Sequence, residues 1–173
     1  MRQWHIICFA LGQERKLLEM LFGKEKRPPS KVPEIQSTHA ILLLHDKYIL
    51  QLRDDKATIA APGQWSLFGG LKNFEERPLD AIKREIYEEL VIEPVRFRFL
   101  WYVVYFSSFE GEAIGTWFFV SDVTAVWHEH KLQEGQAARA FAFEQIPYLE
   151  MPPVMRQTIG KFQRRAKSSE QNP

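Results

Sequence analysis

The sequence predicts a mixed α/β domain in which a β-sheet lies between layers of helices. Short runs rich in β-branched and aromatic residues recur between residues 38 and 143, as in strands. A stripe of four aliphatic residues at helical spacing crosses residues 78–91, and a second helical segment closes the chain at 152–165. Strands that alternate with helices pack as layers around one core.

The first strands are expected close together in the sequence. Residues 38–44 are nearly all apolar, which predicts a buried strand, and 48–53 form a second strand after a turn at Asp46-Lys47. A loop at 54–63 then leads to a short strand at 65–68, which is followed by two glycines.

The remaining strands follow the first helix. Residues 97–106 are aromatic and β-branched and are expected to pair with 115–120 across a turn at 107–111. Residues 138–143 are the last expected strand. Five aromatic residues of this sheet could stack on a nucleobase, but at strand spacing they are expected mainly in the core. They are Trp65, Trp101, Tyr102, Tyr105 and Trp117.

The helix over 78–91 begins with Pro78, whose missing N–H is harmless in a first turn. Leu79, Ile82, Ile86 and Leu90 are its expected buried stripe.

The chain has 173 residues, which fits one domain with extensions at a typical size of about 150 residues. We expect an N-terminal helix and Pro-rich linker at 1–37, the main domain at 38–165, and a flexible basic tail at 166–173. No apolar run reaches the roughly 18 residues that a membrane span needs, so no membrane association is expected. The single cysteine, Cys8, forms no internal disulfide, and a cytoplasmic location is expected.

The charge is uneven along the chain although its net value is +1. Residues 1–33 carry seven Lys/Arg and three Asp/Glu, and 154–173 carry five and one, so each end is +4. Residues 34–153 carry eleven and eighteen, or −7. A nucleic-acid binder usually has a basic folded core, so the acidic core argues against a nucleic-acid partner, and the basic ends are interpreted as solvated tails.

Three carboxylates gather on one side of the expected helix. Glu85, Glu88 and Glu89 are neighbours at spacings of three and four residues, beside the apolar stripe. Three like charges so close disfavour the helix unless a cation lies among them, and Mg²⁺ or Mn²⁺ suits oxygen ligands. Taken alone, such a run is more typical of a solvated acidic face than of a metal site.

The surrounding spacing identifies a motif. The segment is Gly70-x5-Glu76-x7-Arg84-Glu85-Ile86-x-Glu88-Glu89-x-Val91-Ile92. It resembles the Nudix box, G-x5-E-x7-R-E-U-x-E-E-x-G-U, with U a bulky aliphatic residue. The order of elements over about 38–165 is consistent with the Nudix fold, a mixed sheet between helices (α/β/α). Upstream, Phe68 replaces the proline that usually precedes the double glycine.

The resemblance implies roles for the box residues. Glu85 and Glu89 are the principal metal ligands, with Glu88 as a ligand or a holder of metal-bound water. The carbonyl of Gly70 joins the metal shell, and Glu76 points back toward it. Gly69 and Gly70 can take positive φ and let a backbone carbonyl approach a cation. Arg84 is expected to pair with Glu76 or Glu88, a role that suits a bidentate guanidinium.

The one departure from the box is Val91, where the family has glycine. A glycine would end the helix in the left-handed conformation, which a β-branched residue resists. The helix is therefore expected to run on to Ile92 and to stop before Pro94. That changes the helix exit and not the ligands, so activity should survive it.

The family hydrolyses a nucleoside diphosphate linked to another group, so the expected reaction is attack by metal-activated water on phosphorus. The catalytic set is then Arg84, Glu88, Glu89 and Glu134, the last in the loop before the final strand, with the general base open between Glu88, Glu89 and Glu134. The upstream layout around Arg53 and Trp65 faintly resembles that of nucleotide-sugar hydrolases.

Two alternatives stay open. One is a non-hydrolytic Nudix module that binds a nucleotide and regulates a partner, although such modules usually lose a box carboxylate and this chain keeps all. The other is a 5′-end pyrophosphohydrolase of RNA, which the acidic core argues against. The expected partner is a small-molecule nucleoside diphosphate derivative, and a homodimer is a common state in the family.

Overall fold

The computed structural model describes residues 32–94 and 96–170, with side chains described to Ser168. The predicted N-terminal helix and most of the linker lie outside the described residues, as do Cys8 and residues 171–173. The chain divides into two units, Met1–Glu34 and Ile35–Pro173, and the second carries the fold described below. This division falls three residues before the predicted boundary, because the first strand already begins at Ile35.

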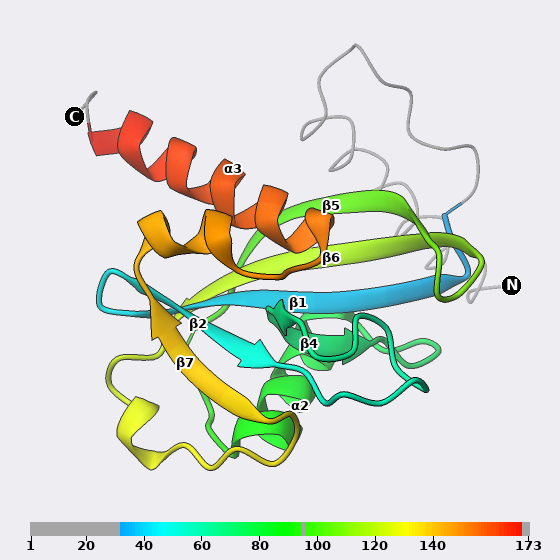
Figure 1. Ribbon diagram of the computed structural model, residues 1–173, viewed down its shortest axis with the longest axis horizontal. Coiled ribbons are helices and arrows are strands. Elements are labelled where there is room, and N and C mark those ends of the chain that lie inside the picture. The colour runs from blue at the N-terminus through cyan, green and yellow to red at the C-terminus, as the bar shows by residue number, and fades with distance from the viewer. Residues whose placement is uncertain (1–31, 95, 171–173) are drawn as a thin grey trace, which may run out of the picture. The chain divides into compact units, whose positions relative to one another are not determined.

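Within the described residues, seven strands form one mixed sheet (Figure 1). They are β1 (Ile35–Leu44), β2 (Lys47–Leu52), β3 (Trp65–Ser66), β4 (Phe68–Leu71), β5 (Arg98–Ser107), β6 (Glu112–Asp122) and β7 (Ala137–Phe141). The main order is β3-β2-β1-β6-β5, while β4 pairs with β1 and β7 pairs with β2. β1 is parallel to β6 and antiparallel to β2 and β4.

Two α-helices cover opposite faces of this sheet: α2 (Pro78–Leu90) and α3 (Pro153–Glu170) (Figure 1). Short 3₁₀ turns, η1 (Trp127–Glu129) and η2 (Phe143–Tyr148), lie in the connections. On the α3 side, Ile41, Leu50 and Phe118 of the sheet belong to one buried cluster with Met155 and Ile159 of the helix. The helix-sheet-helix arrangement confirms the predicted α/β/α class.

The strands agree with the sequence in number and order more closely than in their bounds. The strand predicted at 65–68 is divided into β3 and β4, because Trp65 and Ser66 pair with β2 whereas 68–71 cross over to pair with β1. The hairpin strand predicted at 115–120 extends over all of β6. The last strand ends at Phe141, where η2 follows.

The burial of individual side chains confirms some predicted core residues and corrects one. Ile82, Ile86 and Leu90 are buried as predicted, but Leu79 is 40% exposed and Ala81 takes its place in the core. Among the aromatic residues, Trp101, Tyr102 and Trp117 are buried. They are therefore part of the sheet core.

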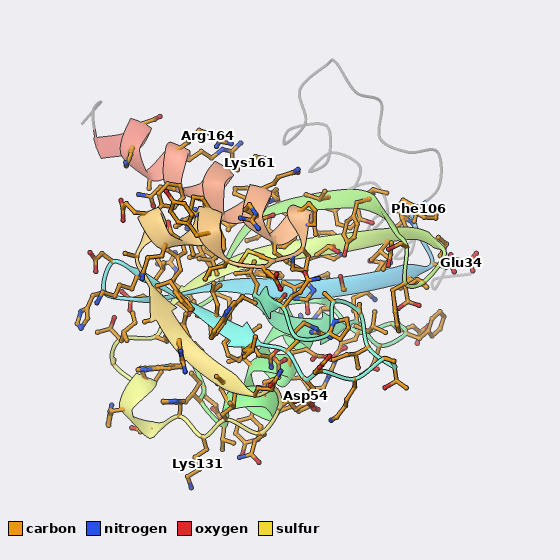
Figure 2. All side chains as sticks on the ribbon, viewed as in Figure 1. Glu34, Asp54, Phe106, Lys131, Lys161 and Arg164 are labelled. Carbon is orange, nitrogen blue, oxygen red and sulfur yellow. The ribbon has the colours of Figure 1, made fainter. Side chains whose placement is uncertain are left out.

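Residues 166–170 are helical, which corrects the predicted flexible tail. No glycine or proline follows Gly160 before Pro173, so nothing in the sequence ends the helix at Arg165. Lys161 and Arg164 belong to this helix, on the side of the sheet opposite α2 (Figure 2). Of the helices in the described part of the chain, none is both long and apolar enough to cross a membrane.

Candidate active site

The apolar face of α2 determines where its carboxylates lie. Ile82, Ile86 and Leu90 are buried, which turns Glu89 inward to 4% exposure. Glu85 lies at the edge of the buried face, and the side chain of Glu88 is 52% exposed. The exposure of the three carboxylates therefore increases from Glu89 through Glu85 to Glu88. All three lie beside the strand that carries the double glycine.

Arg84 is the centre of this acidic group. Its Nε and Nη2 donate to the two oxygens of Glu76 at 2.9 and 3.0 Å. Its Nη1 donates to Glu85 at 2.7 Å and to Glu88 at 2.9 Å, and Nη2 also donates to the carbonyl oxygen of Leu71 at 3.1 Å. All five N–H groups of the guanidinium are therefore used. The sequence predicted a pair with Glu76 or Glu88, and the structure has both.

The charges in this group perturb one another. Hydrogen bonds from Arg84 hold the pKa of Glu76 below its usual range, and the carboxylates raise the pKa of Arg84, with Glu76 the largest cause. The pKa of Glu85 is instead raised, because burial outweighs its pairing with Arg84. The pairing with Arg84 therefore does not fully offset the burial of the Glu85 carboxylate.

Glu89 is the most buried carboxylate of the site. Its Oε2 accepts a hydrogen bond from the backbone N–H of Gly69 at 2.8 Å, and its Oε1 accepts one from Nε2 of Gln51 at 3.1 Å. Burial nevertheless raises the pKa of Glu89 to about 8, and the nearby charge of Glu85 adds to the shift. Loss of hydration is the largest cause of this shift, and it outweighs the hydrogen bonds from Gly69 and Gln51, which lower the pKa.

The two glycines before α2 are needed for different reasons. Gly69 has φ +127, and a Cβ there would overlap the carbonyl oxygen of Thr38 in β1. Gly70 does not take positive φ. Its requirement is spatial, because a Cβ would overlap the carboxylate of Glu85. The backbone of β4 therefore lies directly against a site carboxylate.

The loop that carries Glu134 is bound to the end of α2. The N–H of Lys131 donates to the carbonyl of Leu90, and the N–H of Gln133 donates to the carbonyl of Glu89, both at 2.8 Å. The charge of Glu134 contributes to raising the pKa of Glu85 and Glu89. The structure therefore brings Glu134 to the same electrostatic site, although it is remote in sequence.

Val91 takes the conformation that the motif gives to glycine. The helix ends at Leu90, and Val91 has φ 55 and ψ 34, with its N–H donating to the carbonyl of Tyr87. The expected continuation to Ile92 is therefore wrong. The bonds from residues 131 and 133 occupy the last carbonyls of α2, so the surroundings hold the strained residue in place.

The donor set has the chemistry of a hard divalent cation site. Carboxylates of Glu85, Glu88 and Glu89 and the backbone of Gly70 offer oxygen ligands, which Mg²⁺ and Mn²⁺ prefer. Within residues 32–94 and 96–170, however, no three His, Cys, Asp or Glu side chains stand close enough together to hold a metal. Arg84 accounts for the separation of these carboxylates, because it binds Glu85 and Glu88 itself.

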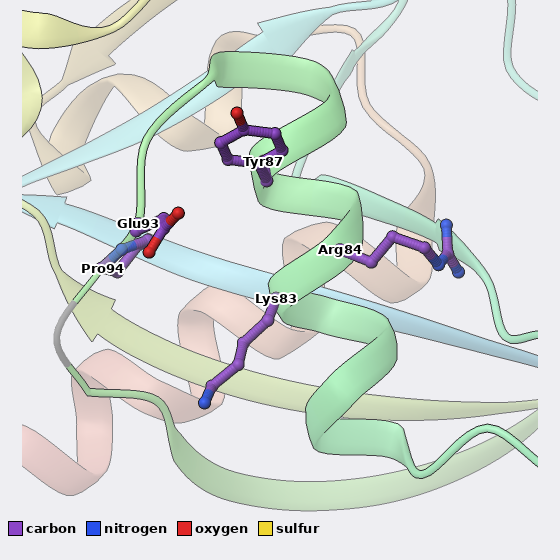
Figure 3. Close-up of a pocket in the computed structure, with 5 residues that line it drawn as sticks. All are labelled: Lys83, Arg84, Tyr87, Glu93 and Pro94. Carbon is purple, nitrogen blue, oxygen red and sulfur yellow. The ribbon is translucent and has the colours of Figure 1, made fainter.

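The described part of the chain has two surface hollows to consider as substrate sites. One, of about 330 Å³, lies on the outer side of α2 against Lys83, Tyr87, Glu93 and Pro94. Arg84 lines its rim but directs its guanidinium away from Lys83 and Glu93 (Figure 3). The other, of about 450 Å³, is mainly apolar. It is lined by Ala57, Ile59, Ala61, Pro62, Gln64, Ser108, Phe109, Pro152 and Pro153.

Sequence reasoning missed one residue of the site, Gln51. It lies in β2 between Leu50 and Leu52 and is only 3% exposed. A polar side chain within a buried strand needs a partner, so this exception to the apolar pattern was the available signal. This signal did not identify Glu89 and Glu134, the partners of Gln51, because they lie far along the chain.

Comparison with known proteins agrees with the fold and the motif. The sequence model of the NUDIX domain matches residues 35–162. The chain therefore belongs to the NUDIX family. A comparison with curated protein sequences gave no match.

Solved structures give the same fold at low sequence identity. A MutT protein from Methanosarcina mazei Go1 is 23% identical, with a TM-score of 0.67 over 79% of this chain and 98% of that one. A MutT NUDIX hydrolase from Burkholderia pseudomallei is 22% identical, with a TM-score of 0.63 over 73% and 95%. The NUDIX domain of NrtR from Shewanella oneidensis, solved as a complex with ADP ribose, is 17% identical, with a TM-score of 0.65 over 82% and 94%.

Proposed function

We propose that this protein is a metal-dependent pyrophosphohydrolase that cleaves a nucleoside diphosphate linked to another group. The observation that carries the proposal is the complete set of box carboxylates around Arg84, beside the glycine backbone of β4. Family membership supports hydrolysis of phosphate-containing compounds, while the choice of substrate and metal rests on the chemistry of the site.

Glu85, Glu88, Glu89 and the carbonyl of Gly70 are the groups that would hold Mg²⁺ or Mn²⁺. The bound cation would neutralise charge on the phosphate oxygens and make water a better nucleophile. The raised pKa values of Glu85 and Glu89 support this assignment, because burial of each carboxylate outweighs the hydrogen bonds and charge that favour its ionised form. Glu76 keeps both oxygens on Arg84, so its additional role as a ligand stays a prediction.

The chain's own residues would supply orientation and proton transfer. Water attacks one phosphorus, the P–O bond of the anhydride breaks, and a carboxylate takes the proton of the water. Both oxygens of Glu89 already accept hydrogen bonds, from Gly69 and Gln51. Glu88 and Glu134 are therefore the better candidates for the base, and separate Glu→Gln variants would distinguish them.

The apolar hollow is the proposed place for the organic group of the substrate. One wall of the hollow is the loop between β2 and β3, across which Nε of Arg53 donates to the carbonyl of Ala60 at 2.8 Å. The same loop carries Lys56, whose pKa is raised mainly by Asp54 and in part by Glu134. One loop thus borders both the hollow and the acidic site, as a bipartite substrate requires.

The test is release of nucleoside monophosphate from nucleoside di- and triphosphates, nucleotide sugars and dinucleotides with Mg²⁺, Mn²⁺ or EDTA. The proposal expects metal-dependent turnover of one class, abolished by Glu89→Gln and retained by Glu93→Gln, an exposed acid just beyond α2. Tight nucleotide binding by a folded protein that hydrolyses none of these compounds would instead support a non-hydrolytic binding module.

A further inference from the structure

We propose that Gln51 is a positioning residue that fixes the buried Glu89 and the loop of Glu134 relative to each other; this inference rests on the proposed function. Its Nε2 donates to Oε1 of Glu89 at 3.1 Å and to the backbone carbonyl of Glu134 at 3.2 Å. A single amide nitrogen therefore joins the helix that bears one carboxylate to the loop that bears another.

The side chain suits this task chemically. A terminal amide has two N–H donors, so it can serve two acceptors at once without adding a charge. Gln51 is 3% exposed and Glu89 is 4% exposed, so water is not a ready substitute at the carboxylate. Removing the amide would leave a buried oxygen of Glu89 unpaired, which costs more than the hydrogen bond itself is worth.

The backbone around Gln51 is closely fitted to the loop. Gly135 has φ +82, and a Cβ there would lie 2.7 Å from the carbonyl oxygen of Leu52 and 2.8 Å from Cγ of Gln51. On the following residue, the N–H and Nε2 of Gln136 donate to the carbonyls of Leu52 and Arg53 at 2.8 and 2.7 Å. The loop therefore rests on the end of β2 at the point where Gln51 reaches through to α2.

The helix end is tied to the same loop independently of Gln51. The N–H of Gln133 donates to the carbonyl of Glu89 at 2.8 Å. Residues 89 and 133–134 are thus linked both directly and through Gln51, so losing the amide should loosen the loop without detaching it. Catalysis depends on sub-ångström placement of such groups, so a small loosening should lower turnover more than binding.

The experiment compares Gln51→Met, Gln51→Asn and a matched control, Gln36→Leu, with the wild-type chain. Methionine keeps an unbranched side chain but has no donor, and asparagine keeps the amide on a shorter stem. Gln36 is a glutamine of neighbouring β1 whose Oε1 accepts from Trp117, away from the carboxylates. Readouts are kcat and KM, Mn²⁺ affinity by calorimetry, and hydrogen exchange of the Gln133 amide against that of Val123.

For Gln51→Met we expect kcat to fall about 10- to 100-fold with KM nearly unchanged, as for residues that orient metal ligands. We also expect weaker Mn²⁺ binding and faster exchange at Gln133, whereas Val123 should exchange as in the wild type. Gln51→Asn should give values between those of the wild type and those of Gln51→Met. In a Glu134→Gln background, Gln51→Met should cost much less, because both changes affect one unit.

The proposal is overturned if folded Gln51→Met keeps the kcat and the Gln133 exchange rate of the wild type, or if Gln36→Leu produces the same losses. If Gln51→Met does not fold, Gln51→Asn decides on the same readouts. Should the wild type turn over no substrate, the proposed function fails, but exchange at Gln133 and Mn²⁺ binding still test the positioning role.

Discussion

The guanidinium of Arg84 holds Glu76, in the loop before α2, through two parallel hydrogen bonds of 2.9 and 3.0 Å. The same group donates to Glu85 and Glu88 on its own helix and to the carbonyl of Leu71. One side chain therefore joins β4, the loop and the helix, and it holds the carboxylates of Glu76, Glu85 and Glu88 in place.

Arg84→Lys should lower kcat/KM by about 10- to 100-fold and leave the fold intact, because an ammonium cannot reproduce five directed donors. The matched control is Arg77→Lys, since Arg77 is exposed and pairs only with Asp80 among the contacts described. Steady-state kinetics and circular dichroism check both variants. Equal kinetics for Arg84→Lys and Arg77→Lys would contradict the organising role of Arg84.

Val91→Gly should raise the free energy of unfolding by roughly 0.5–1 kcal/mol. A left-handed β-branched residue costs about 1–2 kcal/mol, from which the extra chain entropy of glycine, about 0.5–1 kcal/mol, is subtracted. Val91→Ala keeps a Cβ at φ 55 and loses two methyl groups, so it should destabilise the protein. Urea unfolding distinguishes these outcomes, and the proposed strain is wrong if the two substitutions shift the midpoint alike.

The Val91 result shows what the sequence could predict and what it could not. Periodicity predicted α2 and its buried face, because side chains three and four apart share a face in any helix. The end of the helix was missed, since it depends on the N–H groups of Lys131 and Gln133, which arrive from a distant loop. Local propensity argued against the left-handed valine, and tertiary hydrogen bonds hold it there.

Gln51 was missed for a related reason. The spacing of the motif brought Glu76, Arg84, Glu85, Glu88 and Glu89 together from the sequence, since all lie on or just before one helix. Gln51 meets Glu89 only because β2, β7 and the loop between η1 and β7 converge there. The same dependence on strand pairing divided the predicted strand at 65–68 into β3 and β4.

Glu89 should make the metal-free protein less stable as the pH rises. The pKa of this carboxyl is about 8 in the folded chain, against 4.5 when unperturbed. Between these values the folded state binds more protons than the unfolded state, so stability falls with increasing pH by at most about 1.4 kcal/mol per unit. Glu89→Gln should remove this component, whereas Glu93→Gln should not.

The measurement is urea unfolding in EDTA at pH 5.5 and at pH 8. The wild type should lose more stability than Glu89→Gln over this interval, and Glu93→Gln should follow the wild type. Identical pH dependence in all three proteins would show that Glu89 is not held neutral by burial. Added Mg²⁺ should reduce the loss of stability in the wild type and in Glu93→Gln but not in Glu89→Gln, because a cation favours the ionised carboxylate.

Protonation of His39 should destabilise the folded protein in acid. This histidine of β1 is 7% exposed, and its Nδ1 has no hydrogen-bond partner within the described part of the chain. Burial, assisted by the charge of Arg53, lowers the pKa of His39 from 6.5 to about 4. Between these values the unfolded chain binds more protons, so stability is lost as the pH falls from about 6.5 toward 4.

His39→Phe should flatten this part of the stability curve while keeping a ring stacked against Phe118, whose centroid lies 6.2 Å away. The matched control is His128→Phe, at a side chain that is 73% exposed and should leave the curve unchanged. Unfolding free energies at pH 4.5, 5.5 and 7 provide the comparison. If His39→Phe retains the acid sensitivity of the wild type, protonation of this buried imidazole is not what destabilises the fold, and the carboxylates must account for it.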